Sequence, residues 1–367
     1  MDDHQDFSTA ERRLMARGRA GRIPVNGSME LLPLCNLNCK MCYVRLSPEE
    51  MKRQGRLRTW EEWLEAGRQM QRAGVLFLLL TGGEPLLFPD FKKLYLGLRK
   101  LGFVLTINTN GTLIDEEWAD FFAQHKPRRI NITLYGAGRE DYGSLCGNPQ
   151  GFDKVVSAVR LLRQRQVDVK LATSVTPYNV QSLAKMFAIA RELDVPLFAD
   201  TYMMPATRER TLPFDRQSRL GPGEAARARV DAMKLHHPDQ FREFALNMIQ
   251  EVEEFVPEST EPRCVTCYAG NCSFSVSWQG ELHPCVILTE PSVNIFDQNF
   301  QSAWEQVVEG VGKIRLHPDC SVCNLRPLCQ TCAASGLLEG GSYDAKPEYM
   351  CRYAAETLRL LREEVHG

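Results

Sequence analysis

The sequence predicts an α/β fold, in which a partial (β/α)6 barrel over residues 28–202 precedes a small cysteine-rich domain. The first observation is a strand–helix alternation that repeats six times after residue 28, with strands that are apolar along almost their whole length. Such strands are typical of a parallel sheet covered by helices, and six pairs suit an open barrel better than a closed eight-fold one. The second observation is that twelve of the thirteen cysteines lie in two tracts, within residues 35–42 and 264–351.

The strands and helices of the barrel are recognised by their patterns and end signals. Residues 59–74 begin with Thr59 and two acidic residues and end with Gly74, which predicts a helix, and the apolar run VLFLLL that follows predicts a buried strand. Strands are expected at residues 28–34, 75–80, 103–111, 128–135, 167–176 and 195–202. Helices are expected between them at residues 59–74, 88–102, 113–126, 151–166 and 179–194.

The rest of the chain divides into four further segments. Residues 1–27 are expected to form an N-terminal arm, and residues 203–262 a helical connector, because the strand–helix alternation stops there. Residues 263–353 contain the second cysteine tract and are expected to form the small domain, with short β-hairpins. Residues 354–367 have helical spacing and are expected to form a closing C-terminal helix.

Composition excludes some classes of partner. The formal net charge of −2 gives no electrostatic argument for binding nucleic acid or a membrane surface. The longest apolar run, residues 75–80, is too short to cross a bilayer, and the N-terminus lacks the apolar segment of a signal peptide. We therefore expect a cytoplasmic protein, in which clustered cysteines indicate metal or redox chemistry and not disulfides.

The first cysteine tract has three thiols, Cys35, Cys39 and Cys42, spaced C-x3-C-x2-C. A structural zinc site takes four ligands, whereas three thiolates on a four-iron cluster leave one iron open to a small molecule. This spacing, with Tyr43 beside the last cysteine, resembles the signature of the radical S-adenosylmethionine (SAM) superfamily. The resemblance implies that SAM binds the open iron. It also implies that SAM is reductively cleaved to a 5′-deoxyadenosyl radical, which abstracts a hydrogen atom from the substrate.

Further motifs at the predicted strand ends extend this resemblance over residues 28–202. The sequence GGEP stands after the second strand, where the family binds the amino group of SAM, and Glu84 would offer it a carboxylate. The sequence NTNG ends the third strand and matches the family's ribose-contacting turn. The resemblance implies these SAM-binding residues: Met41, Tyr43, Gly82, Gly83, Glu84, Pro85, Asn108, Thr109, Asn110, Thr133, Thr173 and Ser174.

The second cysteine tract alone fits zinc ribbons as well as iron–sulfur clusters. Behind a radical SAM core it resembles the SPASM extension, which carries two auxiliary [4Fe–4S] clusters, although two residues separate the last pair where the family usually has three. The resemblance assigns Cys267, Cys272, Cys285 and Cys332 to the first auxiliary cluster. It assigns Cys320, Cys323, Cys329 and Cys351 to the second, and leaves Cys146 and Cys264 without a cluster.

These motifs together predict a radical SAM enzyme with three [4Fe–4S] clusters that takes electrons from a flavodoxin- or ferredoxin-type donor. By family analogy, the expected substrate is a peptide or protein, such as a ribosomal precursor peptide, which receives a thioether or carbon–carbon crosslink. Asp200 and Tyr202, at the sixth strand end, are the candidate catalytic residues, whereas Val286 stands where sulfatase-maturing relatives carry an acidic residue. Two alternatives remain: the same chemistry on a small molecule of a porphyrin- or quinone-type pathway, and a zinc-binding scaffold.

Overall fold

The computed structural model describes residues 8–205, 218–257, 259–329 and 331–366. Its centre is a nine-stranded sheet with the order β6-β5-β4-β3-β2-β1-β7-β8-β9. The parallel strands are β1 (Asn26–Glu30), β2 (Phe77–Thr81), β3 (Val104–Thr109), β4 (Arg129–Thr133), β5 (Val169–Ser174), β6 (Leu197–Asp200) and β7 (Ser273–Val276). The strands β8 (Glu281–His283) and β9 (Val293–Asn294) are antiparallel. The predicted α/β fold with a parallel core is confirmed.

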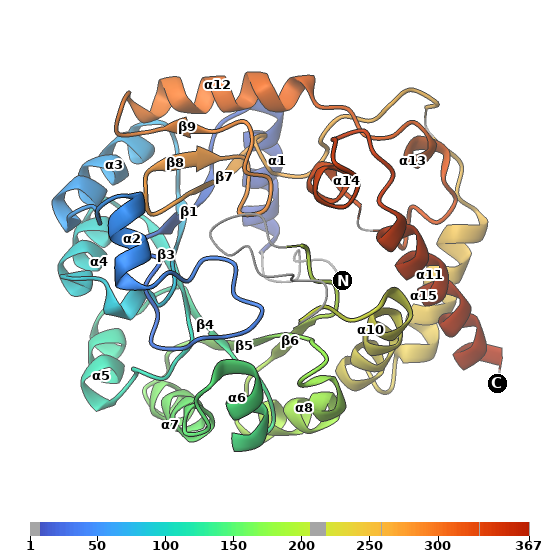
Figure 1. Ribbon diagram of the computed structural model, residues 1–367, viewed down its shortest axis with the longest axis horizontal. Coiled ribbons are helices and arrows are strands. Elements are labelled where there is room, and N and C mark those ends of the chain that lie inside the picture. The colour runs from blue at the N-terminus through green and yellow to red at the C-terminus, as the bar shows by residue number, and fades with distance from the viewer. Residues whose placement is uncertain (1–7, 206–217, 258, 330, 367) are drawn as a thin grey trace.

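Helices follow the parallel strands and lie outside them. Figure 1 shows the sheet curving around the centre of the molecule with this helical layer on its outer side. The barrel helices are α3 (Trp60–Arg72), α4 (Phe91–Lys100), α5 (Glu116–Gln124), α6 (Arg139–Cys146), α7 (Gly151–Gln164) and α8 (Leu183–Glu192). The others are α1 (Thr9–Gly21), α2 (Pro48–Gln54), α10 (Pro222–His236), α11 (Phe241–Glu253), α12 (Phe300–Lys313), α13 (Asp319–Val322), α14 (Ala333–Gly340) and α15 (Glu348–His366). Short 3-10 turns lie at Pro85–Leu87 and Val180–Ser182.

The C-terminal segment does not stand apart from the barrel sheet. β7 pairs in parallel with β1, with Ser28 opposite Ser275, and the two hydroxyls are hydrogen-bonded at 2.9 Å. The sequence led us to expect six strands and a separate set of hairpins, whereas the structure joins β7, β8 and β9 to the sheet. The reason is that β1 would otherwise be an edge strand with unpaired backbone groups.

Several helices lie outside the elements that the sequence predicts. The N-terminal arm contains α1, which begins with a capping box between Ser8 and Glu11 and buries Met15 against Val25 and Phe77. The closing helix α15 begins at Glu348, so Cys351 lies within it and not before it. α15 packs along α10, which fixes the connector against the end of the barrel.

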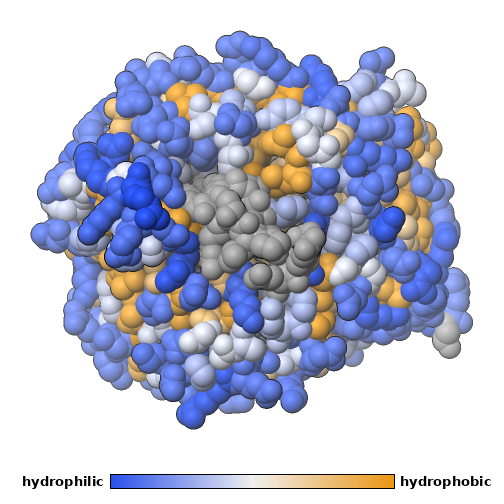
Figure 2. All heavy atoms as spheres, in the orientation of Figure 1, coloured by the Kyte–Doolittle hydropathy of each residue, from blue (hydrophilic) through white to orange (hydrophobic). Residues whose placement is uncertain are grey.

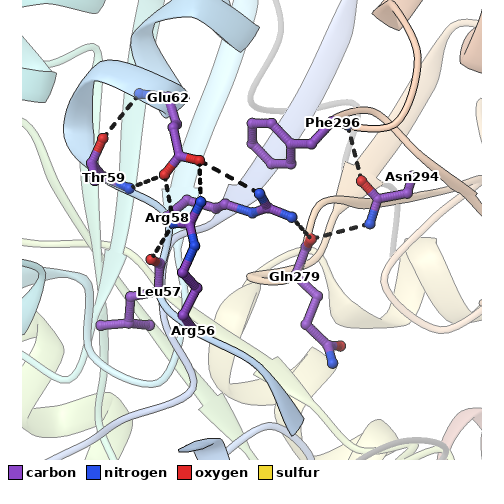
Figure 3. A network of polar contacts seen from close by, with 8 residues as sticks. All are labelled: Arg56, Leu57, Arg58, Thr59, Glu62, Gln279, Asn294 and Phe296. Carbon is purple, nitrogen blue, oxygen red and sulfur yellow. Dashed lines mark hydrogen bonds and ion pairs between the residues drawn. The ribbon is translucent and has the colours of Figure 1, made fainter.

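A polar network joins the start of α3 to the turn between β7 and β8 and to Phe296, which follows β9. Figure 3 shows Glu62 accepting hydrogen bonds from Arg56 and from the backbone N–H of Thr59, with Arg58 beside it. Arg58 donates to the carbonyl of Gln279 at 3.3 Å and its guanidinium lies 4.1 Å from the ring centre of Phe296. The start of a barrel helix is thereby held against the C-terminal segment.

In the part of the chain that the structure describes, every helix is too short or too polar to span a bilayer.

Candidate functional site

A cavity of about 580 Å³ opens at the C-terminal ends of the parallel strands. Its walls come from the first cysteine loop, the ends of β2 to β6 and residues 286–287. Figure 2 shows this face of the molecule, with a largely hydrophilic periphery and apolar patches around its centre. In parallel α/β folds this edge of the sheet is where ligands bind.

The three cysteines of the first tract face this cavity together. Cys35, Cys39 and Cys42 lie on the loop after β1, where Cys39 is 6% exposed and the other two are half-buried. The loop is held by the end of α6, whose Leu145 carbonyl accepts the Lys40 N–H at 3.0 Å and whose Cys146 carbonyl accepts that of Asn38 at 3.2 Å. The loop geometry is therefore set by an element that the sequence did not predict.

These thiols have the properties of ligands that need a cation. Burial raises the pKa of the Cys35 thiol to about 12. The hydrogen bond from the Leu37 N–H lowers this pKa, whereas the neighbouring groups Glu84, Cys39 and Cys42 raise it further. The thiolate form is therefore costly unless a positive charge lies at the site, as a bound metal would supply. A set of three soft ligands facing a cavity fits an iron–sulfur cluster with one open iron.

The GGEP turn passes very close to the cysteine loop. Gly83 donates its N–H to the Leu32 carbonyl at 2.7 Å, and Glu84 donates its N–H to that of Leu34 at 2.9 Å. A Cβ at Gly83 would lie 2.2 Å from the Leu34 oxygen, so only glycine fits there. Gly82 has φ of +151°, and a Cβ there would lie 2.6 Å from the Leu32 carbonyl oxygen. Both glycines line the cavity with backbone atoms.

Glu84 does not line the cavity. Its side chain is fully buried and accepts hydrogen bonds from the Thr109 hydroxyl at 2.7 Å and from the N–H groups of Asn110 and Leu86 at 2.8 and 3.1 Å. Burial raises the pKa of Glu84 to about 7, although these three donors lower it. In this structure the carboxylate holds two neighbouring turns together, and the predicted contact of Glu84 with SAM stays a prediction.

Most of the predicted SAM-binding residues surround the cavity. Its lining includes Met41, Tyr43, Gly82, Gly83, Asn108, Thr109, Asn110, Thr133 and Ser174. Thr173 lies elsewhere, because successive strand residues point to opposite faces, and its hydroxyl contacts Met186 Sδ of α8 at 3.8 Å. Pro85 is buried in the turn that follows the glycines. The structure adds lining residues that the sequence reasoning missed: Thr81, Tyr135, Met203, Met204, Pro205 and Ile287.

Two of these missed residues could have been found from the sequence. Thr81 ends β2 and Tyr135 comes two residues after β4, so the rule that selected Thr133 also applies to them. Met203, Met204 and Pro205 follow β6 without a motif.

Asp200 and Tyr202 both reach the cavity from the end of β6. Asp200 is exposed and accepts the Tyr202 N–H at 3.1 Å, whereas Tyr202 is 9% exposed and donates its hydroxyl to Glu339 of α14 at 3.1 Å. Burial raises the pKa of the Tyr202 hydroxyl well above its ordinary value, and the Glu339 charge raises it further. Tyr202 is therefore a neutral hydrogen-bonding group on the cavity wall.

The cysteines of the second tract form two groups in space. Cys267, Cys285 and Cys332 lie within electrostatic reach of one another, and Cys272 within reach of Cys267. Burial raises the pKa of Cys285 to about 11. The other group lines a second small cavity: Cys320, Cys323, Cys329 and Cys351. Each group has the four thiols that a cubane cluster takes.

The two remaining cysteines differ in burial. Cys146 is 1% exposed and packs against Leu37 and Cys39, beneath the first cysteine loop. Cys264 is exposed.

The comparison with protein families agrees with this geometry, since the model of the radical SAM superfamily matches residues 29–190. The chain contains a radical SAM domain. It is therefore an enzyme, and its family uses a [4Fe–4S] cluster and SAM.

Two curated relatives are similar over most of this radical SAM chain. The AdoMet-dependent heme synthase of Methanosarcina barkeri (strain Fusaro / DSM 804) is 25% identical over 88% of this chain and 95% of that protein. The subtilosin biosynthesis protein AlbA of Bacillus subtilis (strain 168) is 25% identical over 76% of this chain, which spans only 59% of AlbA.

Solved structures share the fold of this chain. The AdoMet-bound enzyme anSMEcpe is 21% identical, with a TM-score of 0.70 over 94% of this chain and 98% of that one. SuiB of Streptococcus suis is 16% identical, with a TM-score of 0.65 over 92% of this chain and 79% of that one. At these identities the likeness establishes the fold alone.

Proposed function

We propose that Cys35, Cys39 and Cys42 hold the [4Fe–4S] cluster of this radical SAM enzyme and that SAM occupies the open iron. The observation that supports this proposal is that three thiols face one cavity, with no fourth cysteine among the described residues of its lining. When bound, the cluster and SAM supply a radical that removes a hydrogen atom from the substrate. The protein itself orients SAM and the substrate and keeps water out.

The residues around the cysteines are suited to orient SAM. The backbone of Gly82 and Gly83 permits close approach of its amino acid part, and Asn108 and Asn110 offer amide groups to the ribose. Met41 and Tyr43 present a thioether and a ring, which pack well against an adenine. We further propose that Thr133 and Ser174 complete this surface.

We propose that eight of the nine cysteines of the second tract hold two auxiliary [4Fe–4S] clusters, for three clusters in all. The first would be held by Cys267, Cys272, Cys285 and Cys332, and the second by Cys320, Cys323, Cys329 and Cys351. This proposal is supported by the two groups of four described above. A reduced flavodoxin or ferredoxin would supply the electrons. Because reduced thiols persist in the cytoplasm, we propose that location for the enzyme.

For the substrate, we propose a peptide or protein that receives an oxidative modification, such as a thioether or carbon–carbon crosslink. The far wall of the cavity is built by uncharged side chains of Met203, Met204, Pro205 and Ile287, and flexible Met side chains adapt to varied partners. Among the described lining residues, Asp200 is the only charged one, and there is no Lys, Arg or His.

Similar proteins support this choice of substrate. AlbA acts in subtilosin biosynthesis, and SuiB and anSMEcpe have been solved with bound peptides. An uncharged wall suits an apolar peptide side chain.

A second candidate is a small molecule of a heme-type pathway, favoured by the M. barkeri heme synthase, which matches this chain over 95% of its length. Porphyrins of such pathways carry carboxylates, and buried carboxylates need cationic partners. The lining described here offers Asp200 instead, so we place this candidate after the peptide.

Deuterium transfer distinguishes the two substrates. The organism that encodes the chain would be grown in deuterated medium, and its extract separated into peptide, protein and small-molecule fractions. Each fraction would be incubated with the anaerobically reconstituted enzyme, SAM and dithionite, and 5′-deoxyadenosine analysed by mass spectrometry. We expect deuterium transfer from a peptide or protein fraction, abolished by prior protease digestion. Transfer from a protease-resistant, porphyrin-absorbing fraction would favour the second candidate.

A further inference from the structure

We propose that Asn110 raises the reduction potential of the cluster that Cys35, Cys39 and Cys42 would hold, by donating an amide hydrogen to the Cys35 sulfur. The inference rests on the first cluster of the proposed function and adds a residue that acts on this cluster through one of its ligands. The sequence pattern places Asn110 only in the turn that is expected to contact the ribose.

The side-chain amide of Asn110 lies against the sulfur of a predicted cluster ligand. Asn110 Nδ2 donates to Cys35 Sγ at 3.6 Å, which is an ordinary length for a hydrogen bond to the large sulfur atom. The backbone N–H of Leu37 donates to the same sulfur at 3.4 Å. Two N–H donors therefore point at one thiol, although Asn110 is 75 residues away from Cys35 in the sequence.

A backbone donor determines which way the Asn110 amide faces. The backbone nitrogen of Thr112 lies 2.9 Å from Asn110 Oδ1. Because a backbone N–H can only donate, the amide atom on this side must be the oxygen. The NH2 group therefore faces the other side, where Cys35 and Asn36 lie. The side chain cannot turn freely, because Asn110 is 4% exposed and Glu84 holds its backbone N–H at 2.8 Å.

A closed ring of side-chain hydrogen bonds favours the same orientation. Asn110 Nδ2 donates to Asn36 Oδ1 at 2.9 Å, Asn36 Nδ2 donates to the Thr112 hydroxyl at 2.8 Å, and this hydroxyl donates to Asn110 Oδ1 at 2.6 Å. The ring uses one hydrogen of Asn110 Nδ2, and the second is directed at Cys35. Asn110 can therefore offer a hydrogen to the ribose only by giving up one of these two acceptors.

The bond from Asn110 acts on the charge that the cluster ligand carries. A ligating cysteine is a thiolate, and a hydrogen bond to a charged acceptor is stronger than one to a neutral thiol. Reduction makes the cluster and its sulfurs more negative, so a donor aimed at sulfur stabilises the reduced form more than the oxidised form. Asn110 thus makes the cluster easier to reduce.

An EPR-monitored redox titration of the anaerobically reconstituted full-length enzyme, without SAM or substrate, tests this role. We would compare the wild type with Asn110→Ala and, as the matched control, Thr112→Val. The control removes a hydroxyl from the ring but keeps the Thr112 N–H, which still orients the Asn110 amide. Spectra of a Cys35→Ala/Cys39→Ala/Cys42→Ala variant at the same potentials would be subtracted to isolate the first cluster. Iron content and thermal unfolding would be recorded for every variant.

A second measurement detects the hydrogen bond itself. The enzyme would be labelled with nitrogen-15 in the side-chain amide of asparagine, and the reduced first cluster would be studied by electron–nuclear double resonance. We expect a nitrogen-15 coupling that persists in Thr112→Val and disappears in Asn110→Ala. If Asn110→Ala failed to bind the first cluster, the presence or absence of this coupling in the wild type would decide.

We expect Asn110→Ala to lower the midpoint potential of the first cluster. At the wild-type midpoint, the ratio of reduced to oxidised cluster should fall about threefold to tenfold, because a hydrogen bond to a charged group is lost. Thr112→Val should stay close to the wild-type potential. An unmoved potential in Asn110→Ala with full iron content, an equal shift in Thr112→Val, or no nitrogen-15 coupling in the wild type would overturn the role of Asn110 alone.

A different result would overturn the proposed function and the inference together. If the iron content did not fall when Cys35, Cys39 and Cys42 were replaced, these cysteines would not hold a cluster on which Asn110 could act.

Discussion

The Glu84 carboxylate accepts the backbone N–H of Asn110 over 2.8 Å and so ties the end of β2 to the end of β3. The Thr109 hydroxyl, at 2.7 Å, adds a second bond to the same carboxylate. Asn110 in turn donates to Asn36 of the cysteine loop at 2.9 Å. One buried acid thus connects three segments that meet at the cavity, and its hydrogen bonds are what position them.

Glu84→Ala should destabilise the protein and impair SAM cleavage. The substitution leaves three donors without an acceptor in a fully buried site, which costs about 2–4 kcal/mol. Thermal unfolding would measure the loss, and 5′-deoxyadenosine formation should fall at least about tenfold because Asn110 is no longer held. Glu84→Gln keeps one acceptor and should lose less. Glu65→Ala, on the exposed side of α3, is the control, and an equal effect there would contradict the argument.

Gly83→Ala should separate the GGEP turn from the cysteine loop. The added Cβ would meet the Leu34 backbone oxygen at 2.2 Å, which forces one of the two chains to move. We expect a loss of 5′-deoxyadenosine formation of at least about tenfold, since misplacing a binding group by about 1 Å has effects of that size.

Gly138→Ala is the matched control for that substitution. Gly138 has extended backbone, and a Cβ there meets nothing within 4 Å. If Gly83→Ala and Gly138→Ala lost similar amounts of activity, the close approach of Gly83 to Leu34 would not be the reason for the loss.

The sequence pattern predicts the barrel because its signals are local. The predicted ranges contain β3 to β6 with one or two extra residues at each end; for example, residues 103–111 contain β3 at Val104–Thr109. The first two strands are shifted instead, since β1 begins before the predicted range 28–34 and β2 ends after the predicted range 75–80. The pairing of β1 with β7 could not be predicted in this way, because it joins segments far apart in the sequence. Ser28 and Ser275 pair across 247 residues, and nothing in either segment specifies the other.

The same contrast holds within the candidate site. Residues at strand ends could be predicted because parallel strands end at one edge, but a strand alternates faces, so an error of one residue exchanges an inward and an outward side chain. Ser174 lines the cavity and Thr173 contacts α8 for this reason. Glu84 could be placed by its motif but not oriented, because its partners Thr109 and Asn110 lie on another strand. The assignment of cysteines to clusters stays a prediction.

Replacing Cys35, Cys39 and Cys42 with Ala should abolish 5′-deoxyadenosine formation and reduce the iron content from about twelve to about eight per chain. The reason is that only the cluster that binds SAM is lost, while the cysteines of the second tract are untouched. Iron and sulfide analysis of anaerobically purified protein measures the first result, and chromatography of the SAM products the second. Retained cleavage of SAM, or zinc in place of iron, would contradict the assignment.

Cys146→Ala and Cys264→Ala are the controls for that experiment. Cys146 is buried under the loop and donates no side chain to the cavity lining, and Cys264 is exposed. Both variants should keep the full iron content. A loss of about four irons in either variant would show that the replaced cysteine is a cluster ligand.

The Glu62 network should make stability depend on pH in the acidic range. The Arg56 hydrogen bond lowers the pKa of Glu62 from 4.5 to about 2, with the Thr59 N–H contributing in the same direction and burial opposing them. Because the folded-state pKa lies below the ordinary value, the stabilisation is present above about pH 4.5 and is lost as the pH falls toward 2.

At pH 7, Glu62→Gln should therefore lower the midpoint of thermal unfolding, with a cost of about 1 kcal/mol for the weakened cap. The difference from the wild type should shrink between pH 4.5 and pH 3, whereas Glu65→Gln, half-exposed on the same helix, should show little effect at any pH. A Glu62→Gln deficit that stays constant down to pH 3 would show that the charge of Glu62 does not hold the start of α3 against the turn between β7 and β8.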